Sequence, residues 1–444
     1  PRGGRAVTAT APAHGDPLHA LVARRWPDPD GGGLLGVPVD SIAIERTLAG
    51  SEGDLVRALG FGGRVAVVFD PATEAALGHR VARALAGRVE LTQVRLPRDV
   101  HADIAAVDRL RIATATMDAL VAVGSGTLND LCKHAAAQDD KPYAVFATAP
   151  SMNGYASGNA AITVDGHKHT LAARAPKGVF VDLEVFCAAP PRLIRAGIGD
   201  SLCRPTAQVD WRLSHELHGS RYRTAPFALL APDEPHWRDA PEAVMGGDLE
   251  AMRALARTLI LSGLGMTLCE GSHPASQGEH LVSHYIDMFA PAARAPYLHG
   301  EQVAVATLAV ARLQERMLAA PPPALRASGE SRGSFEHRFG AQIGASCWSA
   351  FAPKHLTPRD AAALNERIVE AWPRLVETLT RAAVPAQVLE STLRRAGAPT
   401  TAAHIGLTPE FFARAVHEAR YLRDRYTFLD LAGDAGMLDL ALTG

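Results

Sequence analysis

Residues 119–133 read ALVAVGSGTLNDLCK, and this stretch decides the fold class. Ala119 to Val123 is a short apolar run of the kind found in buried strands. It leads directly into Gly124-Ser125-Gly126-Thr127, after which the pattern becomes helical. Glycines let the backbone approach an anion closely, and a helix N-terminus offers free N–H groups. The stretch therefore predicts either a loop for a dinucleotide pyrophosphate or a plain tight turn between strand and helix.

Strands and helices alternate around this stretch. Apolar, β-branched runs predict strands at 64–70, 89–96 and 143–147, with helical patterns between them at 72–86 and 104–116. Such alternation is typical of a parallel sheet. After about residue 190 helical stretches dominate, at 192–217, 248–266, 275–289, 300–318, 359–383, 386–396 and 408–424. We expect an α/β fold with a parallel-sheet domain first and a mainly α-helical domain second.

Composition divides the chain into three parts. Residues 1–35 are rich in Gly, Pro, Ala and Arg, which predicts a flexible N-terminal arm with at most one short helix. Residues 36–190 form the predicted nucleotide-binding α/β domain. Residues 191–444 form the predicted helical domain for metal and substrate, with a polar insertion near 320–345. The last residues, 427–444, are expected to be a tail that packs on the first domain or on a neighbouring chain.

Overall composition argues against several classes of protein. The chain has 444 residues, 47% of them hydrophobic and 21% charged, with a net charge of −2. This near-neutral balance gives no global attraction to nucleic acid or to a membrane surface. No run of about 18 uncharged apolar residues predicts a membrane span. The five cysteines show no CxxC spacing, which predicts reduced thiols in a cytoplasmic protein.

Asp70 ends the strand predicted at 64–70. A carboxylate at this position can accept hydrogen bonds from adenosine ribose hydroxyls and would repel a 2′-phosphate, which favours NAD over NADP. Asp70 also precedes Pro71, so a helix N-cap or turn aspartate is an equal alternative.

Residue types that bind metals occur in three separate motifs. Asp200 follows Gly197-Ile198-Gly199, where a helix is expected to open, and His299 precedes another helix. His280 and His284 are four residues apart, so they share one helix face. One carboxylate and two imidazoles suit Zn²⁺, with Fe²⁺ or Ni²⁺ as alternatives, and leave a position open for substrate. A metal that holds a hydroxyl oxygen lowers its pKa, which favours hydride transfer.

Structural histidines are the alternative interpretation. The chain has 18 histidines, so pairs at helical spacing are expected by chance. His215 with His218, and His167 with His169, are two such pairs, and we predict surface or turn roles for them.

Two longer runs complete the pattern: APSMNGYAS at 149–157 and SHPASQGEHLVSH at 272–284. Together with the glycine loop, Gly199-Asp200 and His299-Gly300-Glu301, they resemble the glycerol-1-phosphate dehydrogenase family. That family belongs to a larger group with glycerol dehydrogenases, iron-dependent alcohol dehydrogenases and dehydroquinate synthases. The resemblance covers roughly residues 38–310, and the two long runs are its most specific parts.

The resemblance implies a Rossmann-like first domain, a helical second domain and an active site in the cleft between them. It implies Asp200, His280 and His299 as metal ligands. His284, Asn153 and Asp200 would be the catalytic residues. The implied contacts with NAD or NADP, which include the glycine loop, are Gly124, Ser125, Gly126, Thr127, Asp130, Thr148, Ser151 and Ser157. The implied reaction is hydride transfer between nicotinamide and a small phosphorylated polyol or ketone, most simply sn-glycerol 1-phosphate and dihydroxyacetone phosphate.

The chain departs from the family pattern at two places. Asn153 stands where the family usually has Asp, which keeps the hydrogen bonding and loses the charge. Arg204-Pro205 replaces a Lys-Tyr pair, and we expect Arg204, with Asn153 and His284, to contact the substrate because a guanidinium can bind phosphate bidentately. A cyclising lyase like dehydroquinate synthase is an alternative, disfavoured by scarce lysines. A non-catalytic cofactor-binding relative is another. A homo-oligomer is expected, since closed symmetric assemblies are common among enzymes.

Overall fold

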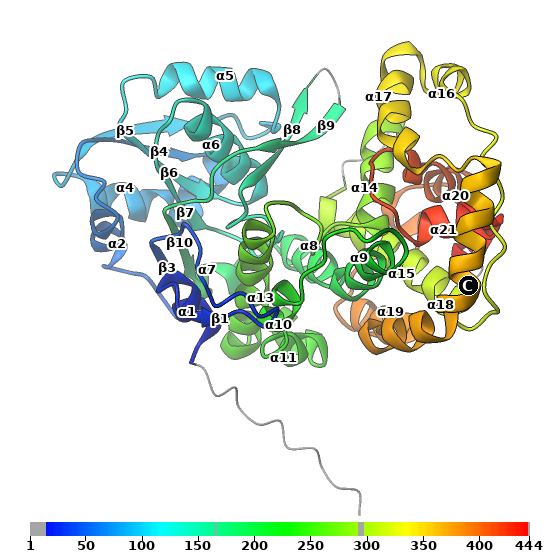
Figure 1. The fold of residues 1–444 in the computed structure, drawn as a ribbon. Coiled ribbons are helices and arrows are strands. Elements are labelled where there is room, and N and C mark those ends of the chain that lie inside the picture. Colours follow the sequence, from blue (N-terminus) through cyan, green and yellow to red (C-terminus); the bar gives the residue numbers. More distant parts are fainter. Residues whose placement is uncertain (1–14, 165–166, 292–296, 443–444) are drawn as a thin grey trace, which may run out of the picture.

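The computed structural model describes residues 15–164, 167–291 and 297–442 (Figure 1). A six-stranded sheet forms the centre of the first domain, in the order β3-β10-β7-β6-β4-β5, and every pair of neighbours is parallel. The strands are β3 (Ser41–Glu45), β4 (Arg64–Phe69), β5 (Glu90–Arg95), β6 (Ala119–Gly124), β7 (Tyr143–Ala147) and β10 (Gly178–Asp182). The predicted α/β fold with a parallel sheet is confirmed.

Both faces of the sheet are covered, because crossover helices must join parallel strands. Every residue of β6, β7 and β10 is buried. Alternate side chains of β4 enter different cores: Ala66 and Val68 belong to one cluster, and Val65 and Val67 to another. The covering helices are α2 (Glu52–Ala58), α3 (Pro71–Thr73), the π-helical turn η1 (Glu74–Gly78), α4 (His79–Leu85), α5 (Ile104–Ala113) and α6 (Gly126–Gln138).

A hairpin of β8 (Asn159–Val164) and β9 (His167–Ala172) leaves the first domain and extends toward the second (Figure 1). The sequence analysis did not predict it. Lys168 of β9 forms an ion pair with Asp287 of the second domain, with Nζ and Oδ2 3.0 Å apart. The hairpin therefore joins the domains across the space between them.

The second domain is helical, as predicted. Its helices are α7 (Leu183–Cys187), α8 (Pro191–Ser201), α9 (Arg204–His218), α10 (Ala225–Leu230), α11 (Glu234–Arg238), α12 (Pro241–Met245), α13 (Leu249–Leu268), α14 (Gly278–Phe289), α15 (His299–Leu318), α16 (Arg332–Phe339), α17 (Ala341–Phe351), α18 (Pro358–Ala382), α19 (Ala386–Arg395), α20 (Pro409–Glu418) and α21 (Phe428–Ala435). The predicted helix 192–217 is interrupted at Leu202-Cys203, so Asp200 ends α8 instead of opening a helix. None of the described helices is long and apolar enough to cross a bilayer.

Residues 15–35 do not form the flexible arm that was predicted. Leu21 of α1 (Pro17–Val22) is fully buried, and β1 (Trp26–Pro27) pairs with β2 (Leu34–Leu35). Arg257 of α13 holds Asp16 through two hydrogen bonds of 2.8 and 2.9 Å. Composition alone could not reveal this, because a polar, glycine-rich segment can be flexible or can be fixed by ion pairs. Residues 1–14 lie outside the described part of the chain.

The other two expected extensions are packed as well. The predicted insertion near 320–345 contains α16, whose Phe335 is fully buried in the core of the second domain. The predicted tail at 427–444 contains α21, whose Phe428 and Leu429 join the same core and which contacts α15. Within the described residues the tail therefore packs on its own domain and not on the first one.

Candidate active site

A cavity of about 560 Å³ lies between the two domains, where the sequence predicted the active site. The first domain contributes the β6–α6 turn, residues 151–163 and β9 to its wall. The second domain contributes α8, the segment 272–276 and the first turns of α14 and α15.

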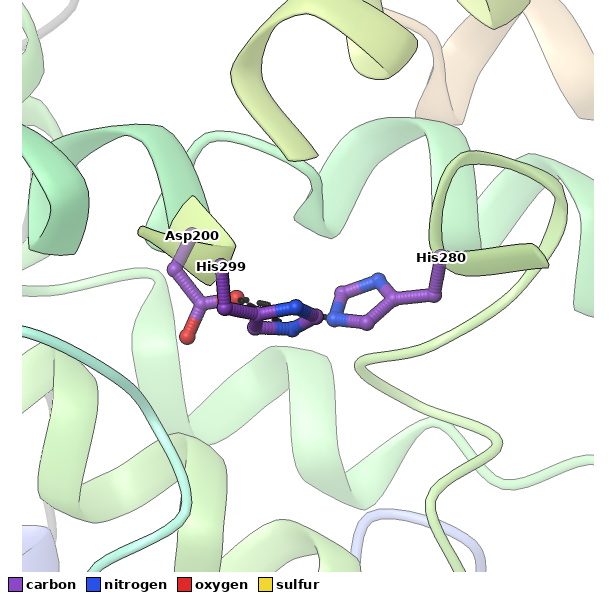
Figure 2. Close-up of side chains that lie close together, drawn as sticks. All are labelled: Asp200, His280 and His299. Atoms are coloured by element: carbon purple, nitrogen blue, oxygen red, sulfur yellow. Dashed lines mark ion pairs between the residues drawn. The ribbon is translucent and has the colours of Figure 1, made fainter. Parts of the chain in front are cut away.

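Three predicted metal ligands meet in this cavity (Figure 2). Asp200 Oδ1 lies 3.5 Å from His280 Nε2 and 3.9 Å from His299 Nε2. They come from the last turn of α8, the first turn of α14 and the first residue of α15. The side chains are far apart in the sequence, and the three helices bring their donor atoms within 4.8 Å of one another.

The donors fit a divalent cation. Asp200 Oδ1 is buried without a hydrogen-bond partner, whereas Oδ2 accepts from the Asn153 backbone N–H at 2.8 Å. A buried carboxylate oxygen without a partner is costly unless a ligand satisfies it. Desolvation alone would raise the pKa of Asp200, but the nearby imidazoles of His280 and His299 hold that pKa below its usual range. Desolvation and Lys168 lower the pKa of His299 to about 3, so its ring is neutral, as a metal ligand must be.

A second group of possible donors shares His280 but is less suited to a metal. It consists of Cys203, Glu279 and His280. Burial raises the pKa of the Cys203 thiol to about 12, which leaves it protonated, whereas metals bind the thiolate. Glu279 instead interacts with the far nitrogen of His280, with Oε1 and Nδ1 2.9 Å apart. Such a carboxylate fixes the ring of a ligating histidine and directs Nε2 toward the metal.

The glycine loop faces the same cavity. Ser125, Gly126, Thr127 and Asp130 line it, and Ser125 is the N-cap of α6 without using its side chain as a cap. A helix N-terminus with free N–H groups next to glycine is suited to a pyrophosphate. Gly124 has a packing role, since a Cβ there would lie 2.3 Å from the Leu128 side chain.

The second predicted cofactor segment, residues 148–157, lies beside the glycine loop. Ser151 and Ser157 line the cavity, and Thr148 donates its backbone N–H to the Gly124 carbonyl at 3.2 Å. Lys133, which the sequence analysis did not single out, holds this segment in place. Its buried Nζ donates to the carbonyls of Gly154 and Asn159, at 2.6 and 3.0 Å. A lysine on the same helix face as Asp130, three residues after it, was the available signal.

Comparison with known proteins identifies the same family as the sequence motifs. A sequence model described as iron-containing alcohol dehydrogenase matches residues 43–190. A Pyrococcus furiosus protein named glycerol-1-phosphate dehydrogenase (NAD(P)+) is 34% identical over 261 residues, which cover 59% of this chain and 74% of the relative. A Bacillus subtilis protein of the same name is 30% identical over 338 residues, covering 76% of this chain and 75% of the relative. The chain belongs to the glycerol-1-phosphate dehydrogenase family.

Solved structures share the fold of this family member at low sequence identity. A probable glycerol dehydrogenase from Sinorhizobium meliloti 1021 superposes with a TM-score of 0.61 at 19% identity, covering 91% of this chain and 97% of the other. A sulfoacetaldehyde reductase from Bifidobacterium kashiwanohense, solved in complex with NAD+, gives 0.60 at 17% identity, covering 92% and 98%. These likenesses concern the fold alone.

Among the residues predicted to meet substrate, His284 and Asn153 line the cavity. The His284 ring centroid lies 6.3 Å from that of His280 and 6.2 Å from that of His299. Burial, then the charges of Arg423 and Lys168, lower the pKa of His284 well below its ordinary value. Its ring is therefore neutral in the cleft.

Arg204, the third residue predicted to meet substrate, does not line this cavity. Its Nε donates to Glu234 Oε1 at 2.6 Å and its Nη1 to Gln208 at 2.8 Å, away from the residues that line the cleft. The break at Leu202-Cys203 starts a new helix, which turns the arginine toward α11. Sequence spacing from Asp200 alone could not reveal this change of direction.

Asp70 adopts the alternative role that the sequence left open. It is the N-cap of α3 and accepts from the backbone N–H groups of Ala72 and Thr73, both at 2.8 Å. It is not among the residues that line the cavity. A contact with ribose, and with it the preference for NAD over NADP, stays a prediction.

Of the competing histidines, His169, His215 and His218 do not line the cavity. His215 Nδ1 lies 2.7 Å from the Ser220 carbonyl just after α9, and His218 packs against Tyr426 with ring centroids 4.2 Å apart. His169 belongs to β9, and the side chain of His167 lies outside the described part of the structure.

Proposed function

We propose that this protein catalyses reversible hydride transfer between a nicotinamide dinucleotide and a small phosphorylated polyol, most simply sn-glycerol 1-phosphate, to give dihydroxyacetone phosphate. The observation that carries the proposal is the meeting of Asp200, His280 and His299 in a cleft that the glycine loop also faces. The relatives named glycerol-1-phosphate dehydrogenase (NAD(P)+) support the nicotinamide cofactor and the phosphorylated substrate.

Each part of the cleft has a role in this reaction. Asp200, His280 and His299 would hold one divalent cation, with Zn²⁺ favoured and Fe²⁺ or Ni²⁺ also suited to these donors. Such a cation polarises a carbonyl as a Lewis acid. The α6 N-terminus with Ser125, Gly126 and Thr127 would hold the pyrophosphate, so that the nicotinamide reaches into the cleft.

The protein's own side chains would orient the substrate and handle the proton. His284 lines the cleft, so a ring nitrogen can exchange a proton with the substrate oxygen, directly or through a water, in either direction of the reaction. Asn153 is uncharged, and its amide can donate to one substrate oxygen and accept from another. Its backbone also fixes the Asp200 carboxylate.

The test is a reduction assay with zinc-loaded protein, dihydroxyacetone phosphate and either NADH or NADPH, followed by nicotinamide absorbance. We expect consumption of the reduced cofactor and formation of glycerol 1-phosphate. Reduced cofactor that persists while a phosphorylated sugar acid is cyclised would favour the lyase. Tight cofactor binding with no turnover of any polyol or ketone would favour the non-catalytic relative.

The ligand assignment has its own test. His280→Ala and Asp200→Ala should each remove bound metal and activity together, as measured by metal analysis of the purified protein. Stoichiometric metal in both variants would overturn the assignment. Homo-oligomeric assembly and a cytoplasmic location stay proposals from the sequence.

A further inference from the structure

Two cationic side chains at one end of the cleft have no role in the account above. Lys168 lines the cavity from β9. Arg423 lies between the short helix η4 (Ala419–Tyr421) and α21, and donates from Nη2 to Thr170 Oγ1 at 3.1 Å. Thr170 itself lines the cavity. Lys168 therefore lines the cleft directly, whereas Arg423 lies next to it, in hydrogen-bond contact with the wall residue Thr170.

Arg423 has capacity for a further partner. Its side-chain hydrogen bond goes to the neutral hydroxyl of Thr170, and no carboxylate lies within 4.0 Å of its guanidinium in the described part of the chain. Burial lowers its pKa, with Asp424 acting in the opposite direction. A guanidinium that is partly buried and lacks a carboxylate partner is costly unless an anion joins it.

A neighbouring arginine strengthens this end of the cleft. Arg425 donates to the Ser276 carbonyl and, at 2.8 Å, to Ser272 Oγ, and both serines line the cavity. It also lacks a carboxylate within 4.0 Å among the described residues, and burial lowers its pKa to about 10. Its two hydrogen bonds fix the wall of the cleft, and its charge adds to that of Arg423.

The charges elsewhere in the cleft make this end the favourable place for an anionic group of the substrate. Asp130 and Asp200 would repel a phosphate unless a cation covers them. Lys168 is already paired with Asp287, with Nζ and Oδ2 3.0 Å apart. Arg423 is close enough to His284 to be the largest charge that depresses the pKa of that ring, after burial itself. The positive end therefore lies beside the residue expected to handle the substrate proton.

We propose that Arg423, assisted by Lys168, binds the phosphate group of the substrate, the role that the sequence assigned to Arg204. The inference rests on the proposed function, since it requires a phosphorylated substrate. Guanidinium suits phosphate because its planar N–H groups make two parallel, charge-assisted hydrogen bonds. Arg423 thus determines the choice of a phosphorylated over an unphosphorylated ketone. Arg425 is a positioning residue through Ser272 and Ser276.

The test compares dihydroxyacetone phosphate with dihydroxyacetone, which lacks only the phosphate. Arg423→Ala should raise KM for the phosphorylated ketone by about 10- to 100-fold, the loss of hydrogen bonds to a charged group. The loss of kcat/KM for dihydroxyacetone should be clearly smaller than the loss for the phosphorylated ketone, and Arg423→Lys should restore part of the latter. Arg221→Ala removes an exposed guanidinium outside this cavity and should match the wild type.

A second measurement separates this inference from the proposed function. Calorimetric titration with inorganic phosphate should show binding to the zinc-loaded wild type and at least tenfold weaker binding to Arg423→Ala, with unchanged thermal unfolding. If the wild type reduces the phosphorylated ketone and Arg423→Ala keeps its KM, the inference alone is overturned. If the wild type reduces neither ketone, the proposed function fails, and the phosphate titration still decides the role of Arg423. Equal phosphate binding by the wild type and Arg423→Ala, or no phosphate binding by the wild type, overturns the proposed role of Arg423.

Discussion

Glu279 lies behind His280 without being one of the proposed metal ligands. It is fully buried, lies 2.9 Å from His280 Nδ1 and accepts from the Gln277 backbone N–H at 2.8 Å. Glu279→Gln should therefore lower zinc affinity by about 10- to 100-fold, the usual effect of removing a carboxylate behind a metal-bound histidine. Competition with a chromophoric chelator measures this affinity. Glu270→Gln changes an exposed carboxylate and should have no effect, and an unchanged affinity in both variants would contradict the role of Glu279.

His273 makes stability depend on pH. Its ring stacks on Trp211 with centroids 5.8 Å apart, and burial, with Arg425, lowers its pKa from 6.5 to about 4. A histidine whose pKa falls on folding is protonated in the unfolded chain first, so stability is lost as pH falls from about 6.5 to 4. His273→Phe keeps the stacking. In this variant the free energy of unfolding should fall by about 2 kcal/mol less between pH 6.5 and 4 than in the wild type, after allowance for solvent screening. Urea unfolding at pH values on both sides of this range measures the difference, and parallel pH profiles for the two proteins would refute it.

At the scale of elements, two helices approach closely to place the ligands. A Cβ on Gly300 of α15 would lie 1.9 Å from the Ala196 carbonyl oxygen of α8, and a Cβ on Gly199 would lie 2.3 Å from the Gly300 carbonyl oxygen. Only glycine allows this contact, which sets Asp200 beside His299. Gly199-Asp200 and His299-Gly300-Glu301 therefore contain both the proposed ligands and the glycines that allow the two helices to pack closely.

Gly300→Ala should push α8 away from α15. We expect a loss of about 1–3 kcal/mol of stability from overpacking, together with weaker zinc binding because Asp200 and His299 separate. Thermal unfolding and chelator competition measure the two effects. Gly62→Ala, where a Cβ would meet open space, is the matched control. If Gly300→Ala binds zinc as the wild type does, the helix crossing does not set the ligand geometry.

Elements also show where sequence reasoning succeeds and fails. The buried strands were found because β-branched runs such as 119–123 have few alternatives. The three candidate ligands were predicted together because their residue types and motifs are specific. The position of Arg204 could not be predicted because its direction depends on a helix break and on Glu234, thirty residues away. Arg423 and Lys133 were missed because only folding brings them beside Thr170 and the 154–159 segment.

At the scale of the whole molecule, contacts at several separate points hold the two domains on either side of the cleft. The N-terminal segment is tied by Asp16 and Arg257 to α13, which contacts α8. The β8–β9 hairpin is tied to α14 by the Lys168–Asp287 pair and to the C-terminal segment by the hydrogen bond between Arg423 and Thr170. We therefore expect substrate and cofactor to meet between lobes that are held together at several separate points.

A cation bound by three helices should stabilise this arrangement as a whole. Ligands that bind only the folded state add about 2.7 kcal/mol at a free concentration 100 times the dissociation constant. Removal of metal by a chelator should therefore lower the melting temperature of the wild type by a few degrees, and added zinc should restore it. Asp200→Ala lacks a ligand, so its melting temperature should not respond to chelator or zinc. Asp108→Ala, on the exposed face of α5, should respond as the wild type does. Equal responses of Asp200→Ala and the wild type would mean that zinc stabilises the fold from another site, and that the three helices do not share one cation.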